Sequence, residues 1–465
     1  MKKRKLSLVM LIIAAVTCTT LSGCQSGKIA SDDNSGIMTV TVWSKDTHSK
    51  KVFEAYINEY NLGQGKKDGI KIDYIVKEGE NIDQSVDLAL QSGDAPDIFY
   101  TSAAIKKLIE NNYIANLQDL PGGPEFLKKY ENDFIEGAHK VDGKIYTVPN
   151  SSTTQGLVYN KDMFKAAGIV DEKGEAKPPE TLDELREYAK KLTNPAKNEY
   201  GIIMPVKWEP WFRDDVMALL HPTVGHNGYN PVTRKFEFEG VEPIFDSIMG
   251  MFDDGSVYPG ASSLENDQAR AQFAYGGIGM KFAYSYDVGV YTQQFPAQID
   301  WGVAPLPIID KNERYLQRMF VGSTSFLSQK SLETKDKEKL MTVIKLFTSD
   351  DIIQKCYLEG VALPYDWNIV KDLKSDNLPK GWAGFAALSA ISCPSNTFPQ
   401  IEMAGKRTID ERFLTDVMSK KATAADAIKE FTADAIAGME EFYKNNTSED
   451  INLNYDDKWD TKRKD

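Results

Sequence analysis

The stretch KWEPWFRDD, residues 207–215, places two tryptophans beside a carboxylate. An aromatic ring offers a flat apolar face, and an ionised carboxylate accepts strong hydrogen bonds. Together these groups can hold a molecule that carries hydroxyls around a flat C–H face, as a sugar does. The same rings could instead fill a hydrophobic core, because most aromatic side chains in a chain of 465 residues must be buried.

Helical geometry separates these two roles. Pro210 suits the first turn of a helix and leaves Glu209 beside the N-terminus, where the helix dipole favours its carboxylate form. The core-facing stripe that follows comprises Phe212, Val216, Leu219 and Leu220. At about 100° per residue, Trp211 lies well off that stripe. We expect Glu209 and Trp211 to face a ligand, whereas Trp208, which precedes the helix, stays undecided.

The N-terminal third predicts alternating strands and helices. Alternating β-branched residues predict strands at 37–43 and 70–76, and a third strand begins within 96–100. Helical periodicity predicts helices over 50–62 and 82–91. This β-α-β-α-β order indicates an α/β fold with a mostly parallel sheet covered by helices.

Residues that follow strands of such a sheet are candidates for binding, because ligands lie beyond the carboxyl ends of the strands. The candidates at these positions are Trp43, Lys45, Asp46, His48, Tyr100, Thr101 and Ser102. Trp43 could equally close the core.

The rest of the chain predicts further elements of both kinds. The segments 143–149 and 156–160 resemble short strands joined by a polar loop, NSSTTQ. Helices are predicted over 161–167 and 182–192, the second opened by Thr181 with Glu184 three residues later. A buried strand is expected at 278–283. The last helix, 424–443, has as core candidates Ala427, Ile428, Phe431, Ile436 and Met439.

Composition indicates a globular chain of two or three domains. Apolar residues make up 42% and charged residues 26%, and the net charge is −13. An acidic chain is poorly suited to bind nucleic acid, whose phosphates select basic surfaces. No nucleic-acid partner is therefore expected.

The N-terminus is predicted to be a targeting segment. A basic head precedes the apolar run 8–16, which is too short to span a bilayer and typical of a secretory signal over residues 1–23. The signal ends in LSGC, which resembles the lipobox of bacterial lipoproteins and makes Cys24 the expected lipid site. Residues 24–36 then form a polar, flexible tether. Cys356 and Cys393 are expected to be buried thiols, although a disulfide between them stays open.

Motifs for catalysis, metal binding and nucleotide binding are missing from the sequence. None of His48, His139, His221 and His226 forms an HExxH pair, and neither GxSxG nor GxxxxGK[ST] occurs. No catalytic residue, cofactor or metal site is predicted.

Several segments, in this order, resemble the bacterial extracellular solute-binding proteins of family 1, which are sugar-binding lipoproteins that serve ABC importers. The segments are SGDAPDIFY, DGKIYTVP, LVYNKDMFKAAGI, PPETLDELREYAKKLT, FAYGGIGM, WGVAPLPI and SDDIIQKCYLEGVALP. The resemblance implies a two-lobed periplasmic-binding-protein fold of type II. It places residues 37–160 with 319–365 in lobe 1, and 161–318 with 366–465 in lobe 2. The chain would cross between lobes near 159–160, 318–320 and 364–366.

The resemblance also implies a function. The protein would capture a carbohydrate, an oligosaccharide above all, between its lobes and deliver it to the ABC permease, as a monomer anchored to the outer face of the membrane and without catalysis. Glu209 would accept hydrogen bonds from the sugar and Trp211 would be its platform, while Ser285 and Tyr286 stand where the family often places a cleft aromatic. The alternatives are a non-sugar solute, such as a peptide or a phosphorylated compound, and a surface glycoside hydrolase.

Overall fold

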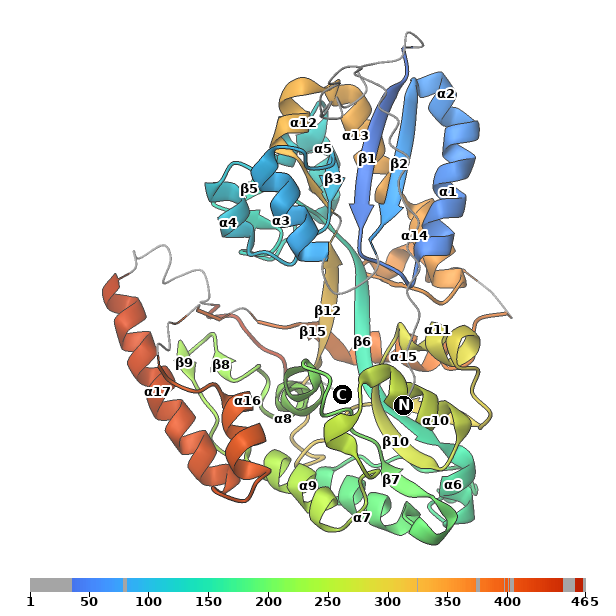
Figure 1. Cartoon of the computed structure of the whole chain (residues 1–465), viewed down its shortest axis with the longest axis vertical. Coiled ribbons are helices and arrows are strands. Elements are labelled where there is room, and N and C mark those ends of the chain that lie inside the picture. The colour runs from blue at the N-terminus through green and yellow to red at the C-terminus, as the bar shows by residue number, and fades with distance from the viewer. Residues whose placement is uncertain are drawn as a thin grey trace, which may run out of the picture.

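The computed structural model describes residues 36–77, 82–323, 325–373, 377–396, 398–399, 401, 405–445 and 456–462. These residues form two lobes, one above the other along the long axis of the molecule (Figure 1). Each lobe is built on its own β-sheet, and helices flank both sheets. The predicted two-lobed α/β fold is confirmed.

Lobe 1 holds a four-stranded sheet in the order β13-β3-β1-β2. The strand β1 (Met38–Ser44) runs parallel to β2 (Ile70–Val76) and β3 (Ile98–Phe99), and β13 (Phe326–Leu327) is antiparallel to β3. A hairpin of β4 (Lys140–Val141) and β5 (Lys144–Ile145) lies outside this sheet. The helices are α1 (Lys50–Leu62), α2 (Gln64–Asp68), α3 (Ile82–Ser92), α4 (Ile105–Glu110), α5 (Gly123–Leu127), α12 (Gln329–Thr334), α13 (Lys337–Phe347) and α14 (Asp350–Leu358).

The larger sheet belongs mainly to lobe 2 and extends through β6, β12 and β14 into the connection between the lobes; its order is β15-β12-β6-β10-β7, with β11 and β14 also paired to β6. The strands are β6 (Pro149–Asn160), β7 (Tyr200–Ile202), β10 (Ile278–Tyr284), β11 (Trp301–Ala304), β12 (Gln317–Ser323), β14 (Leu363–Pro364) and β15 (Ser392–Pro394), and β8 (Tyr229–Asn230) and β9 (Lys235–Phe236) form a separate hairpin. The helices are α6 (Lys161–Ala166), α7 (Leu182–Leu192), α8 (Leu220–Val224), α9 (Glu242–Asp253), α10 (Asn266–Tyr275), α11 (Asp287–Gly289), α15 (Trp382–Leu388), α16 (Ile409–Arg412) and α17 (Ala424–Asn445).

Helix ends follow the predicted capping chemistry closely. The hydroxyl oxygen of Thr181 accepts a hydrogen bond from the amide of Glu184 at 3.2 Å and begins α7 at Leu182. The carboxylate of Glu184 accepts from the amide of Glu180 rather than from Thr181, at 2.7 Å. The predicted start of this helix is therefore confirmed, but the carboxylate of Glu184 binds the amide of Glu180 instead of that of Thr181.

The core face of α17 is partly different from the prediction. Ala427, Ile428, Phe431 and Met439 are buried, as expected. Ile436, however, is 49% exposed, and its neighbour Ala435 is fully buried in its place. The prediction for Ile436 was wrong because Ala435, and not Ile436, continues the four-residue spacing from Phe431 on the core face.

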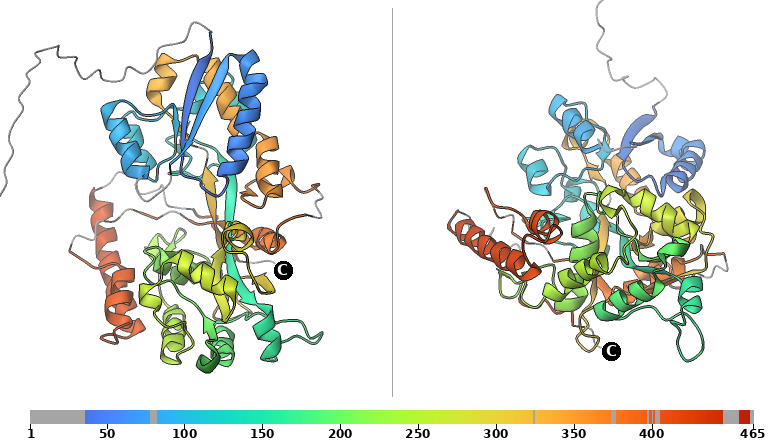
Figure 2. Two further views of the ribbon diagram at one scale, coloured as in Figure 1. Left: turned by 45° about the vertical axis from the view of Figure 1, so that its right-hand side comes forward. Right: turned by 60° about the horizontal axis from the view of Figure 1, so that its bottom comes forward.

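The strand β6 connects the two lobes and contradicts the predicted loop NSSTTQ. Residues 151–154 pair with β12, and residues 155–159 pair with β10. The polar side chains are satisfied within the fold: the hydroxyl of Thr154 donates to the carbonyl of Phe385 at 2.9 Å, and the amide of Gln155 donates to the carbonyl of Asp214 at 2.6 Å. Partners so distant in sequence are invisible to local pattern analysis. In both views β6 and β12 run together from one lobe into the other (Figure 1, Figure 2).

The end of β6 before residue 160 packs with lobe 2. Leu157 and Tyr159 pack in one core with Phe164 and Leu185, which belong to lobe 2. We therefore propose that the first crossing lies earlier in β6, near Ser151–Thr154. The remaining boundaries, at 318–319 and 365–366, stay as proposed. Among the described residues, no helix combines the length and apolar character that a membrane span requires.

Candidate functional site

The larger of the two cavities described here has a volume of about 740 Å³ and lies where the lobes meet. Lobe 1 contributes the loops after β1 and β3, the linking strands β6 and β12 contribute backbone and side chains, and lobe 2 contributes Tyr286. Of the residues predicted from sequence, the cavity brings together Lys45, Asp46, His48, Tyr100, Thr101 and Tyr286.

The loop after β1 is shaped by Asp46. Its carboxylate accepts hydrogen bonds from the amides of His48 and Ser49, at 3.0 and 3.2 Å, and from the hydroxyl of Ser49. These bonds turn the chain into α1 and fix the position of His48. Lys45, on the same loop, holds its ammonium 3.9 Å from the ring centre of Tyr100, a cation–π contact that orders the cavity rim.

Three aromatic rings stack across the cavity and join the lobes. Tyr286 lies 5.0 Å from the imidazole of His48, with an interplanar angle of 22°, and 5.1 Å from the ring of Tyr284, at 8°. His48 belongs to lobe 1 and both tyrosines to lobe 2. Trp208 packs edge-on against Tyr284 at 6.4 Å, so it is half-buried behind the stack. In this arrangement Tyr284 covers one face of Tyr286 and His48 covers the other, so a ligand could stack on Tyr286 only in place of His48.

A buried network of charges supports Tyr284 and Tyr286. Asp287 pairs with Arg270 at 2.6 Å and accepts a hydrogen bond from the amide of Tyr284 at 3.1 Å. The hydroxyl of Tyr284 donates to Asp215 at 3.1 Å. Burial raises the pKa of Asp215 to about 7, although the nearby charge of Lys281 opposes this. The network fixes both rings from behind.

The interpretation of Trp211 was wrong. Its side chain is 1% exposed and packs 6.3 Å from the ring of Phe413, in the same core as Phe212. Residues 212–216 form a π-helical turn, not an α-helix. The predicted stripe of Phe212, Val216, Leu219 and Leu220 is buried, but Asp215 and Ala218 are buried as well, so the segment is enclosed on more than the one face that helical spacing indicates. Trp211 offers no free ring face for stacking.

The other candidates lie outside the cavity lining. Glu209 is exposed, but it is not among the residues that line the cavity. Ser285 is 2% exposed and its amide donates to the carbonyl of Thr154 at 2.9 Å, while the amide of Ser102 donates to Asp83 at 2.7 Å. Trp43 packs beside the core of lobe 1, with the ammonium of Lys77 4.0 Å from its ring centre. Ligand binding by these residues stays a prediction. The contacts just given show structural roles for Ser285, Ser102 and Trp43.

Much of the cavity wall was not predicted from the sequence. The missed residues include Phe53, Tyr74, Asn150, Ser151, Ser152, Thr153, Phe320 and Phe347. The polar members lie on β6, in the stretch interpreted as a loop. The aromatic members come from four separate elements, and only tertiary structure brings them together.

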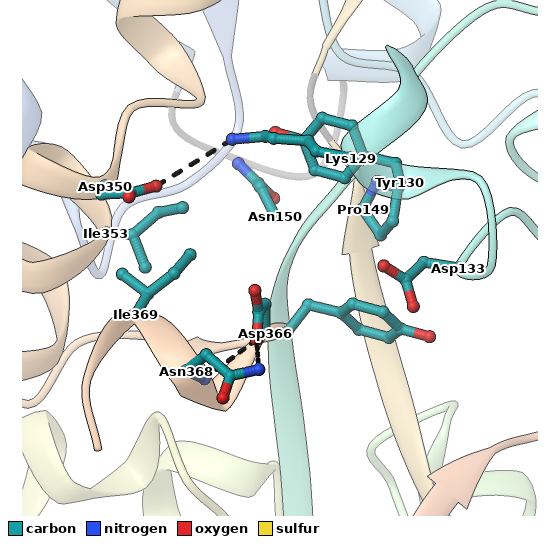
Figure 3. A pocket seen from close by; sticks show the side chains of 11 residues that line it. Lys129, Tyr130, Asp133, Pro149, Asn150, Asp350, Ile353, Asp366, Asn368 and Ile369 are labelled. Carbon is teal, nitrogen blue, oxygen red and sulfur yellow. Dashed lines mark hydrogen bonds and ion pairs between the residues drawn. The ribbon is translucent and has the colours of Figure 1, made fainter. Parts of the chain in front are cut away.

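The smaller cavity, of about 250 Å³, lies beside the first and shares Asn150 and Ile353 with it (Figure 3). The ammonium of Lys129 lies 3.9 Å from the carboxylate of Asp350. Burial raises the pKa of Asp133, and the charge of Asp366 adds to the effect. None of the residues predicted from sequence lines this cavity, and we place the candidate site in the larger one.

The described residues contain no cluster of three or more histidines, cysteines and acids that could hold a metal ion. His139 and His221 are buried, and desolvation lowers the pKa of each to about 4. Cys356 and Cys393 are free thiols, and Cys356 lines the larger cavity. Cys24 lies outside the described residues.

A two-lobed α/β molecule with a ligand-sized cavity between its lobes has the architecture of proteins that close over a solute. The sequence matches the family model described as bacterial extracellular solute-binding protein over residues 45–351. The chain belongs to this family, which consists of exported binding proteins.

Relatives and solved structures agree with this assignment. The maltotriose-binding protein of Pyrococcus abyssi is 22% identical over 407 residues, which cover 86% of this chain and 82% of that protein. The GacH receptor of Streptomyces glaucescens, solved unliganded and with acarbose, is similar in fold, with a TM-score of 0.66 at 17% identity over 88% of this chain and 99% of that one. A chitin oligosaccharide binding protein has a TM-score of 0.65 at 18% identity, over 87% and 99%.

Proposed function

We propose that the protein captures an oligosaccharide in the cavity between its lobes and delivers it to an ABC permease. The observation that carries the proposal is the aromatic stack of Tyr284, Tyr286 and His48 beside a rim of hydrogen-bonding side chains. When the ligand displaces His48, the ring of Tyr286 can stack on the C–H face of a sugar, while Lys45, Asp46 and the hydroxyls of β6 can bind its hydroxyl groups. Relatives that are named for binding maltotriose and chitin oligosaccharides support this substrate class.

The composition of the cavity weighs against the alternatives. Among its lining residues Lys45 is the single lysine or arginine, whereas a phosphorylated compound favours a cluster of them. Asp46 is the single carboxylate of the lining, whereas glycoside hydrolysis requires two carboxyl groups roughly 5–10 Å apart. Binding without catalysis fits this set of side chains better.

We further propose that the mature protein is a monomer, anchored through a lipid on Cys24 to the outer face of the membrane. The lipobox LSGC and the preceding apolar run support the anchor. Residues 1–35 lie outside the described residues.

Isothermal titration calorimetry with maltose, cellobiose and chitin oligosaccharides tests the function. We expect one of these series to bind the wild-type protein and Tyr286→Ala to weaken that binding at least tenfold, because the variant removes the platform. Tyr275→Ala is the matched control, since Tyr275 is a tyrosine of α10 in the same lobe, is 55% exposed and does not line the cavity. Equal binding by both variants would refute the assignment of the platform, and release of shorter glycans would refute the binding function.

A further inference from the structure

The cavity between the lobes has a second part with a different chemistry. Its wall in lobe 1 is formed by residues that we call the apolar arm: Phe53, Tyr74, Ile344, Phe347, Ile352 and Cys356. They come from α1, β2, α13 and α14. Figure 1 shows α1, β2 and α14 on the same side of lobe 1, with α14 facing the level where the lobes meet.

The arm contains a cluster of three rings that remain half-buried although they lie inside the lobe. Phe53 stacks on Tyr74 at 5.8 Å and on Phe347 at 5.7 Å, and Tyr74 lies 6.0 Å from Phe347. Phe53 also packs against the pair Ile352 and Cys356, so the arm is continuous. Residues so placed would normally be buried by neighbours, and here their remaining surface lines the cavity.

Polar partners are scarce in the arm. The hydroxyl of Tyr74 already hydrogen-bonds to Ser44, and burial raises the pKa of the Cys356 thiol to about 12, which keeps it neutral. None of the six residues carries a charge at neutral pH. A sugar ring placed here would leave its hydroxyl groups without partners, which costs free energy, whereas an apolar group would not.

The arm adjoins the polar rim directly. Ser44, the partner of Tyr74, is followed in sequence by Lys45 and Asp46, and all three line the cavity. A ligand with one polar and one apolar part could therefore reach both regions at once. The cavity volume of about 740 Å³ leaves room for both parts.

We propose that the apolar arm binds an aromatic or short alkyl group attached to the sugar, so that the solute is an amphipathic glycoside. This inference rests on the proposed function and narrows the class of substrate. The sugar lies against Tyr286 and the polar rim, and its apolar substituent lies against the cavity-lining surface of Phe53, Phe347 and Cys356.

Calorimetry with pairs of probes that differ in the substituent alone tests the arm. The pairs are the methyl and 4-nitrophenyl glycosides of maltose, cellobiose and chitobiose. For the sugar that binds, we expect the 4-nitrophenyl glycoside to bind roughly 10- to 100-fold more tightly, because a ring becomes buried. Equal affinities within the pair would contradict binding of the substituent by the apolar arm and leave the proposed function intact.

Variants with a larger side chain in the apolar arm test whether the preference for the 4-nitrophenyl glycoside arises there. Cys356→Phe, and the milder Cys356→Leu if the first does not fold, should reduce the ratio of the two affinities about tenfold. Cys393→Leu is the control, because Cys393 is also a free thiol but does not line the cavity. An unchanged ratio in a folded Cys356 variant would overturn the proposal.

An uncharged apolar probe without a sugar separates the two proposals. N-phenyl-1-naphthylamine should fluoresce more strongly with the wild-type protein than with the filled Cys356 variant, and Cys393→Leu should match the wild type. If no glycoside binds but this difference appears, the proposed function fails and the arm stands as an apolar site. If the probe does not distinguish the variants, the arm is refuted.

Discussion

A ligand can stack on Tyr286 only if it displaces the imidazole of His48. The rings lie 5.0 Å apart at 22°, and Tyr284 already covers Tyr286 from inside lobe 2. Two rings cannot share one face, so His48 takes the face that a sugar would need. We predict that His48→Ala binds oligosaccharide more tightly than the wild-type protein.

The magnitude follows from the geometry of the pair. A stacked aromatic pair contributes about 0.5–1.5 kcal/mol, and about 1.4 kcal/mol corresponds to a tenfold change in affinity. Removing the imidazole should therefore tighten binding by roughly 2- to 12-fold. The hydrogen bond to the carboxylate of Asp46 comes from the backbone amide of His48 and not from its side chain, so the loop should keep its shape in the alanine variant.

Titration calorimetry with the oligosaccharide that binds measures the change, and Lys51→Ala is the matched control. Lys51 is an exposed residue of α1, three positions away, and does not line the cavity. Weaker binding by His48→Ala would mean that His48 contacts the sugar. It would refute the claim that His48 competes with the ligand for Tyr286. Unchanged binding would show that the stack does not compete with the ligand.

Three further outcomes are expected. Trp211→Ala should lower the free energy of unfolding by roughly 3–5 kcal/mol, because Trp211 is a core residue. Urea denaturation measures this change. A loss below about 1 kcal/mol would contradict the burial of Trp211. Asp215 binds a proton more readily in the folded state, since its pKa is raised to about 7 from 3.8, so its contribution to stability decreases as pH rises from 4 to 7. Asp215→Asn should flatten the profile of melting temperature against pH over that range, and identical profiles would contradict the shift. Cys24→Ser should move the protein from the membrane fraction to the soluble fraction, and continued retention would reject the lipobox.

Local elements were largely predictable from the sequence. The helix α1 and the strand β2 begin and end where periodicity placed them, and Thr181 caps α7 as expected. These features depend on neighbours within a few residues. The order of strands and helices in lobe 1 therefore followed from the alternation of patterns.

Features that depend on distant partners were not predictable. Trp211 is buried against Phe413, which is about two hundred residues away in sequence. The polar strand β6 has the composition of a loop, and its partners β12 and β10 make it a strand. The candidate site mixes both cases: strand-end positions such as Lys45 and Tyr100 were found, but the cluster of Phe53, Tyr74 and Phe347 was not.

The linking strands also determine how freely the lobes can reorient. At Ser151 and Ser152 the strand β6 is bonded to β12 on one side and to β14 on the other, so hydrogen-bonded backbone joins the lobes here. A ribbon of this kind bends and twists, but it samples far fewer orientations than a flexible linker. Little conformational entropy is then lost when the lobes close, because most of that loss has already occurred on folding. The affinity for a solute should accordingly reflect contacts in the cavity more than the ordering of the connection.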